Sequence, residues 1–336
     1  MTKLVEKRSE ILFCYDVTDA NPNGDPMDEN KPRIDEETGI NIVTDVRLKR
    51  TIRDYLFDYR GYNGTNGKDI LIREIKEENG IQDAKMRAED FIIVDGKKID
   101  KKAVKNHIAK DKPKDSELLE KMIEIIDKNI KEQCIDIRLF GATLPIEFST
   151  KEKSSITYTG PVQFKIGRSL HPVELKFIKG TGAFASQPGA GHKTFREEYI
   201  LPYSFIAFHG IINETAAAHT NLSEDDSAEL LNALWNGTKN LISRSKFGQM
   251  PRLLFRVIYK DRGFFIGDLE KRIQISGIEN PLKIRSVKDF TLDISNLLAL
   301  FDKYGDKIES VEYMVDDTLK LSGELPGSFN RIKLLA

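Results

Sequence analysis

The chain has 336 residues, and its 52 lysines and arginines are almost balanced by 53 aspartates and glutamates. A formal net charge of −1 argues against a protein that coats nucleic acid over its whole surface, but it allows a basic track on one face. This length is sufficient for one elaborated domain or for two domains with separate cores.

Cysteine, histidine and hydropathy patterns give no sign of a disulfide framework, a metal site or a membrane helix. Cys14 and Cys134 lie in apolar segments without a pairing pattern, and the five histidines are scattered. No apolar run approaches the roughly 20 residues of a membrane helix, and the N-terminus has no signal-peptide core. We therefore expect a cytoplasmic protein that has no cofactor, no bound metal ion and no membrane partner.

The first expected elements are a strand and a helix, joined by a loop that is rich in turn-forming residues. Residues 10–18 alternate as in a half-buried strand, and the loop over residues 19–39 is rich in Pro, Gly, Asn and Asp. Thr44 is a suitable N-cap for a helix that runs to about residue 59.

The helix that Thr44 begins carries cations beside its apolar face. At 100° per residue, Lys49 and Arg53 fall just outside one edge of that face, with Arg50 beyond them, while Arg47 falls on the other side. The helix therefore offers a row of cations at the edge of its buried stripe, although an ordinary solvated helix would show the same arrangement.

The middle of the chain reads as a helical insertion, after which strands resume. Residues 61–131 contain two amphipathic segments for which we expect helices, 68–80 and 116–134. Beyond them the pattern predicts strands over 135–146, 156–178, 196–213 and 251–260, and helices over 223–245 and near 295–305. Without the insertion the order is βαββαβ, the plan of the ferredoxin-like fold that RNA-recognition domains share.

Basic residues are concentrated in two blocks, one from Gln163 to Arg196 and one from Thr238 to Arg262. Glu174 is the single acidic residue of the first block, and Asp261 is that of the second. Such local excess in a neutral chain suggests an anionic partner, although chance placement on strand faces would explain part of it.

The first block ends in a glycine-rich stretch, GAFASQPGAGHKTFR, over residues 182–196. It is not a nucleotide-binding P-loop, because His192 separates Gly191 from Lys193 and a strand-like segment follows. A surface hairpin without a ligand and a contact with the phosphates of a nucleic acid both remain open.

The chain resembles the backbone subunit of type I CRISPR interference complexes (Cascade), most closely that of the I-B and I-C branch. The segments that carry the resemblance occur in order across about residues 10–260. They are YDVTDANPNGDP, RIDEETGINIVTDVRLKRTIRDYL, IDIRLFGA, GPVQFKIGRSLHPVE and GHKTFREEYILPYSFIAFHGIIN.

The resemblance implies an α+β fold with the parts of a hand. Its palm is a ferredoxin-like, RNA-recognition-motif fold (βαββαβ), made here by residues 1–60 and 132–260. Inserted helical fingers would span 61–131, a β-hairpin thumb 175–200, and a C-terminal extension that packs on the palm 261–336.

The resemblance also implies a non-catalytic function in antiviral defence. Copies of the subunit line up head to tail along a CRISPR guide RNA and present it for pairing with target DNA, together with other Cascade subunits. The expected RNA-binding residues are Lys49, Arg50, Arg53, Gln163, Arg168, Ser169, Lys193, Arg196, Arg244 and Lys246, and the candidates for a base wedge are Phe184 and Phe195.

Two other classes of function remain open from the residues alone. Asp16, Asp19, Asp25 and Asp28 lie close together in sequence, and carboxylates could hold a magnesium ion in a metal-dependent ribonuclease. The same residues are ordinary in a turn-rich loop. The second class is a module that binds only other proteins, in which the two basic blocks arise by chance.

Overall fold

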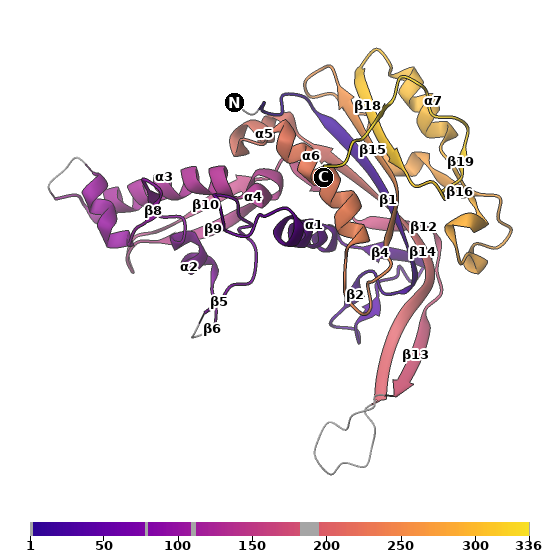
Figure 1. Ribbon diagram of the computed structural model, residues 1–336, viewed down its shortest axis with the longest axis horizontal. Coiled ribbons are helices and arrows are strands. Elements are labelled where there is room, and N and C mark those ends of the chain that lie inside the picture. The colour runs from indigo at the N-terminus through magenta and orange to yellow at the C-terminus, as the bar shows by residue number, and fades with distance from the viewer. Residues whose placement is uncertain (1–2, 78–79, 109–111, 182–194, 336) are drawn as a thin grey trace, which may run out of the picture. The chain divides into compact units, whose positions relative to one another are not determined.

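The computed structural model describes residues 3–77, 80–108, 112–181 and 195–335. These residues form two compact units. Unit 1 comprises the residues up to Glu6 together with Arg53–Gln163 and Asn213–Leu230, and unit 2 comprises Lys7–Ile52, Phe164–Ile212 and Leu231–Ala336. Helices and strands both contribute, so the predicted α+β class is confirmed (Figure 1).

Unit 2 is built on a nine-stranded sheet. The strands along its main path are β20 (Asn330–Arg331), β18 (Ile308–Val315), β15 (Met250–Tyr259), β1 (Ser9–Ala20), β14 (Phe195–Ile212), β12 (Gly167–Pro172) and β4 (Ile40–Val43). The short strand β11 (Val162–Phe164) and the strand β13 (Lys176–Thr181) also pair with β14.

The strand β1 lies at the centre of this sheet, as its apolar sequence predicts. It pairs antiparallel with β14 on one side and with β15 on the other. The side chains of Phe13 and Cys14 are fully buried although they point to opposite faces, so both faces of β1 are covered. Leu12, Phe205, Phe255, Leu292 and Phe301 belong to the core on one face.

The strands β13 and β14 form a two-stranded ribbon that extends beyond the rest of the sheet (Figure 1). The pairing runs from Lys176 opposite Ile200 to Thr181 opposite Phe195. At its base the rings of Phe177 and Tyr199 lie 4.9 Å apart.

Unit 2 contains further short elements around the sheet. They are β2 (Gly24–Asp25), β3 (Lys31–Pro32), β16 (Gln274–Ser276), β17 (Thr291–Asp293), β19 (Leu321–Ser322), the helix α7 (Ser295–Lys303), the 3₁₀ helices η3 (Leu269–Arg272), η4 (Pro281–Lys283) and η5 (Val287–Asp289), and the π-helical turn η2 (Ala233–Gly237). The expected short helix near 295–305 is thereby confirmed.

Unit 1 packs helices against a two-stranded sheet. The sheet pairs β9 (Gly141–Glu147) with β10 (Lys153–Thr159), and α3 (Asp115–Gln133) lies beside it (Figure 1). Met122, Ile126, Ile137, Leu144 and Tyr158 belong to one buried cluster. The remaining elements are α2 (Ala84–Glu89), α4 (Ile135–Phe140), α5 (Glu214–Thr220), η1 (Lys101–His107), β5 (Lys76–Glu77), β6 (Gly80–Ile81), β7 (Ile93–Val94) and β8 (Lys97–Lys98).

The two helices with predicted N-caps both begin where expected, but the one expected over residues 223–245 is shorter than predicted. Its α-helical part ends at Asn232, a π-helical turn follows to Gly237, and residues 241–245 form a loop. The helix α1 (Asp45–Tyr59) begins after Thr44, whose hydroxyl accepts a hydrogen bond from the Arg47 amide at 3.2 Å. The helix α6 (Glu224–Asn232) begins after Ser223, and a reciprocal pair of hydrogen bonds joins Ser223 to Asp226.

Two segments of unit 1 were wrongly predicted. Residues 135–140 form the helix α4 and not a strand, and β9 begins only at Gly141. Gly141 has a φ of +66°, and a Cβ there would lie 2.2 Å from the Tyr158 carbonyl oxygen. A glycine at this position therefore allows the sharp change from helix to strand.

The expected helix over residues 68–80 is also absent from the part of this segment that the structure describes. Side chains from elsewhere in the fold form hydrogen bonds with the backbone of this segment in place of a helical pattern. The amides of Leu71 and Ile72 donate to the Asp136 carboxylate, and the Arg87 guanidinium donates to the carbonyl oxygens of Ile70 and Leu71. The described helices include none that is long and apolar enough to cross a membrane.

Candidate nucleic-acid interface

Three segments of unit 2 that are distant in sequence meet beside the base of the β13–β14 ribbon. The loop after β1 contacts the loop over residues 241–249, because the Asn21 amide donates to the Ser245 carbonyl oxygen at 2.8 Å. The 241–249 loop reaches β14 through an ion pair of 3.4 Å between Arg244 and Glu198. In addition, the Lys31 ammonium lies 5.3 Å from the centre of the Tyr199 ring.

The first turn of α1 adds a further cation to this region. The charge of Arg47 acts on the half-buried ammonium of Lys246, which donates to the carbonyl oxygen of Asn21 at 3.3 Å. We call Lys31, Arg47, Arg244 and Lys246 the basic loop cluster. It brings together cations from three different parts of the sequence.

The electrostatics at Lys246 favour an anionic ligand. Burial lowers the pKa of its ammonium below the ordinary value, and the positive charge of Arg47 lowers it further. Its hydrogen bonds go to neutral oxygen atoms of Asn21 and Ser245. A phosphate group close to Lys246 and Arg47 would relieve their mutual repulsion and would favour the charged form of the lysine.

The loop that carries Lys246 also presents apolar side chains to water. Phe247 is 72% exposed and Ile242 is 78% exposed. Gly248, with a φ of +87°, makes the turn that follows Phe247. An exposed aromatic ring next to cations is typical of surfaces that bind single-stranded nucleic acid, because bases stack on the ring while cations neutralise the backbone.

The predicted cations of α1 occupy different environments. Arg50 is exposed, whereas Lys49 forms an ion pair of 3.1 Å with Asp45 on the same helix. Arg53 is only 12% exposed, and its guanidinium lies 3.1 Å from the fully buried carboxylate of Asp136. The Arg53 guanidinium also lies 5.2 Å from the centre of the Phe140 ring. Arg53 is thus held inside unit 1, and Arg50 is the accessible cation of the three.

The predicted residues around β12 also separate into exposed and buried. Arg168 is exposed, and its guanidinium lies 3.2 Å from the Asp35 carboxylate. Ser169 is buried, and its hydroxyl donates to the His171 carbonyl oxygen and accepts from the Asn41 amide. Gln163 is exposed at the edge of unit 1 and donates to the Gly160 carbonyl oxygen at 3.0 Å. Of these three side chains, that of Ser169 is fully used by contacts within the fold.

The residues predicted to lie in the thumb are described only in part. Phe184 and Lys193 lie outside the described residues. Phe195 and Arg196 are described by their backbone, which pairs with Thr181 and Gly180 of β13. The roles predicted for these four residues therefore remain predictions.

Three of the four aspartates of the alternative ribonuclease site are held by neighbouring groups. Asp16 is buried and accepts from the Tyr203 hydroxyl at 2.8 Å, with the Arg252 guanidinium 3.0 Å away. Asp25 is paired with Arg33 at 2.6 Å, and Asp28 with Lys31 at 2.7 Å. Asp19 is exposed at the end of β1. In the described part of the chain, these four carboxylates do not gather into a set of metal ligands.

Sequence reasoning overlooked three members of this surface. Lys31 lies in a loop whose composition indicates only turns. The helical pattern places Arg47 on the opposite side of its helix from the other cations. Phe247 is absent from the predicted contacts. The available signal was the segment SRSKFGQ, in which a phenylalanine stands among basic and small residues within the second basic block.

The chain shares its fold with two solved chains, which are described as "CRISPR RNA-guided surveillance complex, pre-nicking" and "CRISPR RNA-guided surveillance complex". Both have a TM-score of 0.52 and 13% sequence identity to this chain. Each match covers 96% of this chain, together with 95% of the first solved chain and 94% of the second.

The sequence defines the family to which the chain belongs. Residues 7–295 match the family described as CRISPR-associated protein Cas7. A CRISPR-associated protein Cas7 from Haloferax volcanii is 32% identical over 333 residues, covering 94% of this chain and 88% of the relative. The chain belongs to the Cas7 family, which confirms the resemblance seen in its sequence at the level of the family.

Proposed function

We propose that this protein is a non-catalytic, guide-RNA-binding backbone subunit of a type I CRISPR surveillance complex of the I-B and I-C branch. Membership of the Cas7 family supports the class of complex. The observation that carries the binding function is the basic loop cluster, in which three separate segments contribute cations, and one of these segments also carries the exposed ring of Phe247.

The sheet of unit 2 supports the assignment of an RNA-recognition-like palm. The strand β14 lies between β1 and β12, and β1 lies between β14 and β15, with all of these neighbours antiparallel. This interleaved order is that of two split βαβ units, as in ferredoxin-like folds. In this proposal 61–131 are the fingers, 175–200 the thumb, and 261–336 an extension that packs on the palm.

Contacts with the RNA backbone suit a subunit that must hold any guide. Cations and hydrogen-bond donors aimed at phosphates carry no sequence information, so sequence reading is left to base pairing. Arg50, Arg168, Arg244 and Lys246 are the predicted residues whose positions fit such contacts, together with Lys31 and Arg47. Phe247 adds a stacking surface.

The proposed subunit acts inside the cell, where several copies line up head to tail along one guide RNA. The assembled copies, with the other Cascade subunits, hold the guide for pairing with target DNA in antiviral defence. Head-to-tail contacts are heterologous and produce an open filament, whose length is set by the RNA and by capping subunits.

The first test is the nucleic acid that accompanies the full chain when it is purified from cells at moderate salt. We expect a raised ratio of absorbance at 260 nm to that at 280 nm, lost after RNase and not after DNase, and RNA of mixed sequence in a large, filament-like species. A nucleic-acid-free monomer that ignores added single-stranded RNA would overturn the proposal.

Charge reversal locates the interaction. The double variant Arg244→Glu/Lys246→Glu should lose RNA, whereas Lys288→Glu, which changes an exposed lysine of η5, should retain it.

Cleavage of the bound RNA in the presence of magnesium would instead support a ribonuclease, if alanine substitutions at Asp16, Asp19, Asp25 and Asp28 abolished that cleavage.

A further inference from the structure

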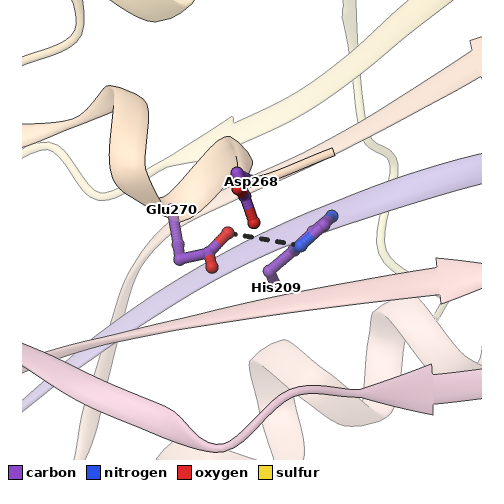
Figure 2. A group of neighbouring side chains, drawn as sticks. All are labelled: His209, Asp268 and Glu270. Atoms are coloured by element: carbon purple, nitrogen blue, oxygen red, sulfur yellow. Dashed lines mark ion pairs between the residues drawn. The ribbon is translucent and has the colours of Figure 1, made fainter. Parts of the chain in front are cut away.

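A buried histidine in unit 2 faces two carboxylates that are about 60 residues away in the sequence. His209 lies on β14, whereas Asp268 precedes η3 and Glu270 lies within it. Figure 2 shows the three side chains pointing toward one another. One potential ligand atom from each side chain lies within 4.8 Å of the other two. The scattered histidines of the sequence gave no indication of this group.

The tautomer of His209 follows from its other neighbour, Glu10. The Glu10 carboxylate is fully buried and accepts from the Ile266 and Gly267 amides and the Tyr259 hydroxyl. Because these three donors already surround the Glu10 carboxylate, Nε2 of His209 carries a proton and donates to Oε1 of Glu10 at 2.7 Å.

The Nδ1 atom of His209 faces a carboxylate oxygen atom. It lies 3.2 Å from Oε2 of Glu270. Both atoms are buried and have no hydrogen-bond partner within the described residues, and His209 is only 7% exposed. When His209 is protonated at Nε2 alone, the lone pairs of Nδ1 and Oε2 repel each other at this distance, and a proton on Nδ1 or a metal ion between the two atoms removes that repulsion.

We propose that His209 Nδ1, Glu270 and Asp268 form a binding site for a divalent transition-metal ion such as Zn²⁺. Bonds of about 2.1 Å to a common ion place neighbouring ligand atoms about 3.0 to 3.4 Å apart, which matches the spacing of Nδ1 and Oε2. An imidazole combined with carboxylates suits Zn²⁺ better than Mg²⁺. Glu10 is the outer carboxylate that metal-bound histidines commonly require.

Lys165 provides the cation at this site when no metal is bound. Its ammonium lies 2.5 Å from Asp268 and 3.0 Å from Glu270. The Lys165 side chain is 48% exposed, so its ammonium can move into solvent when an ion enters. The ammonium of Lys271 also lies 3.0 Å from the Asp268 carboxylate. The bound ion would tie β14 to the 266–272 segment.

The test uses the full chain after treatment with a chelator. Titration with Co²⁺ should give one saturable equivalent with visible d–d absorption, which Zn²⁺ displaces and Mg²⁺ does not. Zn²⁺ should also raise the melting temperature. Glu270→Gln and Asp268→Asn should each lose the bound equivalent, whereas Lys165→Met should bind severalfold more tightly because the competing ammonium is gone.

Two controls keep the proposal falsifiable. His209→Gln removes a partner of the buried Glu10 and is expected to destabilise the fold, so the carboxylate variants decide the outcome. His107 lies among glutamates of α3 and offers an alternative site, so His107→Gln should leave binding unchanged. The proposal is overturned if neither the wild type nor Lys165→Met takes up one equivalent, or if Glu270→Gln binds the ion as the wild type does.

Discussion

At the scale of single residues, Phe247 gives the most direct test of RNA contact. Its ring is 72% exposed and follows Lys246 in the sequence. Stacking of a base on an aromatic ring contributes about 1–3 kcal/mol, so Phe247→Ala should weaken binding of single-stranded RNA roughly 5- to 150-fold. Fluorescence anisotropy with a labelled RNA measures the effect.

The matched control for Phe247 is Phe265→Ala, since Phe265 is also exposed, at 49%, and belongs to unit 2. The Arg8 guanidinium lies 5.6 Å from the centre of the Phe265 ring. Neither Arg8 nor Phe265 belongs to the basic loop cluster. Equal affinities of the Phe247 variant and the wild type would remove stacking at this position from the interface.

Arg50 and Arg53 are predicted to respond differently although both lie on α1. Arg53→Ala leaves the buried carboxylate of Asp136 without its cation, and breaking a buried pair costs about 3–5 kcal/mol. We expect a clear loss of unfolding free energy for Arg53→Ala in urea. Arg50→Ala should leave the free energy of unfolding almost unchanged. It should reduce the slope of the logarithm of the RNA-binding constant against the logarithm of the salt concentration by about 1, which corresponds to the loss of one phosphate contact.

The two arginine variants can be judged together. If Arg53→Ala were as stable as the wild type and lost RNA affinity for unrelated sequences equally, then Arg53 would be a direct RNA contact as the helical pattern predicts. Loss of affinity for a single RNA sequence with Arg50→Ala would contradict a contact with the backbone.

At the scale of elements, β12 is joined to its neighbours through a histidine that must stay neutral. Nε2 of His171 accepts from the Phe205 amide on β14 at 3.2 Å, so the proton is on Nδ1, which lies 2.8 Å from the Pro172 carbonyl oxygen. Burial lowers the pKa of His171, and the nearby charge of Arg285 lowers it further, against the opposing effect of the Pro172 hydrogen bond. The Tyr203 ring, stacked at 5.8 Å, covers the imidazole.

The lowered pKa of His171 predicts acid sensitivity of the fold. Because the unfolded chain binds this proton more readily than the native one, the stabilisation is complete above about pH 6.5 and falls as pH decreases toward the native pKa. The loss attributable to His171 is at most about 1.4 kcal/mol per pH unit. Urea unfolding at pH 7, 6 and 5 should show a smaller loss for His171→Gln, and identical pH profiles would refute this role.

The same scale shows which elements the sequence could predict. The helices α1 and α6 were predictable because Thr44 and Ser223 are N-caps that act within one turn, and β1 because its apolar pattern is local. The 68–77 segment was not, because its hydrogen bonds depend on Asp136 and Arg87, which reach it only in the folded chain.

The candidate interface was predictable only in outline for the same reason. The two basic blocks indicated an anionic partner, and Arg244 and Lys246 do lie in the basic loop cluster. Patterns along the sequence could not distinguish Arg50 from Arg53, because the difference between them is the buried carboxylate of Asp136. Nor could they predict that Nδ1 of His209 lies 3.2 Å from Oε2 of Glu270, because the two residues are distant in sequence and meet only in the folded chain.

At the scale of the whole molecule, the balanced charge is compatible with close packing of copies. The net charge of −1 limits repulsion between neighbours, and several exposed cations are paired with carboxylates of the same chain, among them Arg168 with Asp35 and Arg244 with Glu198. Assembly should therefore depend on RNA, because an RNA strand supplies the phosphates that join successive copies.

This dependence predicts that the mass of the assembly rises with RNA length in equal steps. We expect native mass spectrometry with RNAs of increasing length to add one copy of the chain for each fixed number of nucleotides, and to show no such series without RNA. The series should be the same for unrelated sequences, because backbone contacts do not distinguish bases. Arg244→Glu/Lys246→Glu should abolish the series and Lys288→Glu should preserve it. A single bound copy on every RNA length would show that the chain binds RNA but does not polymerise along it.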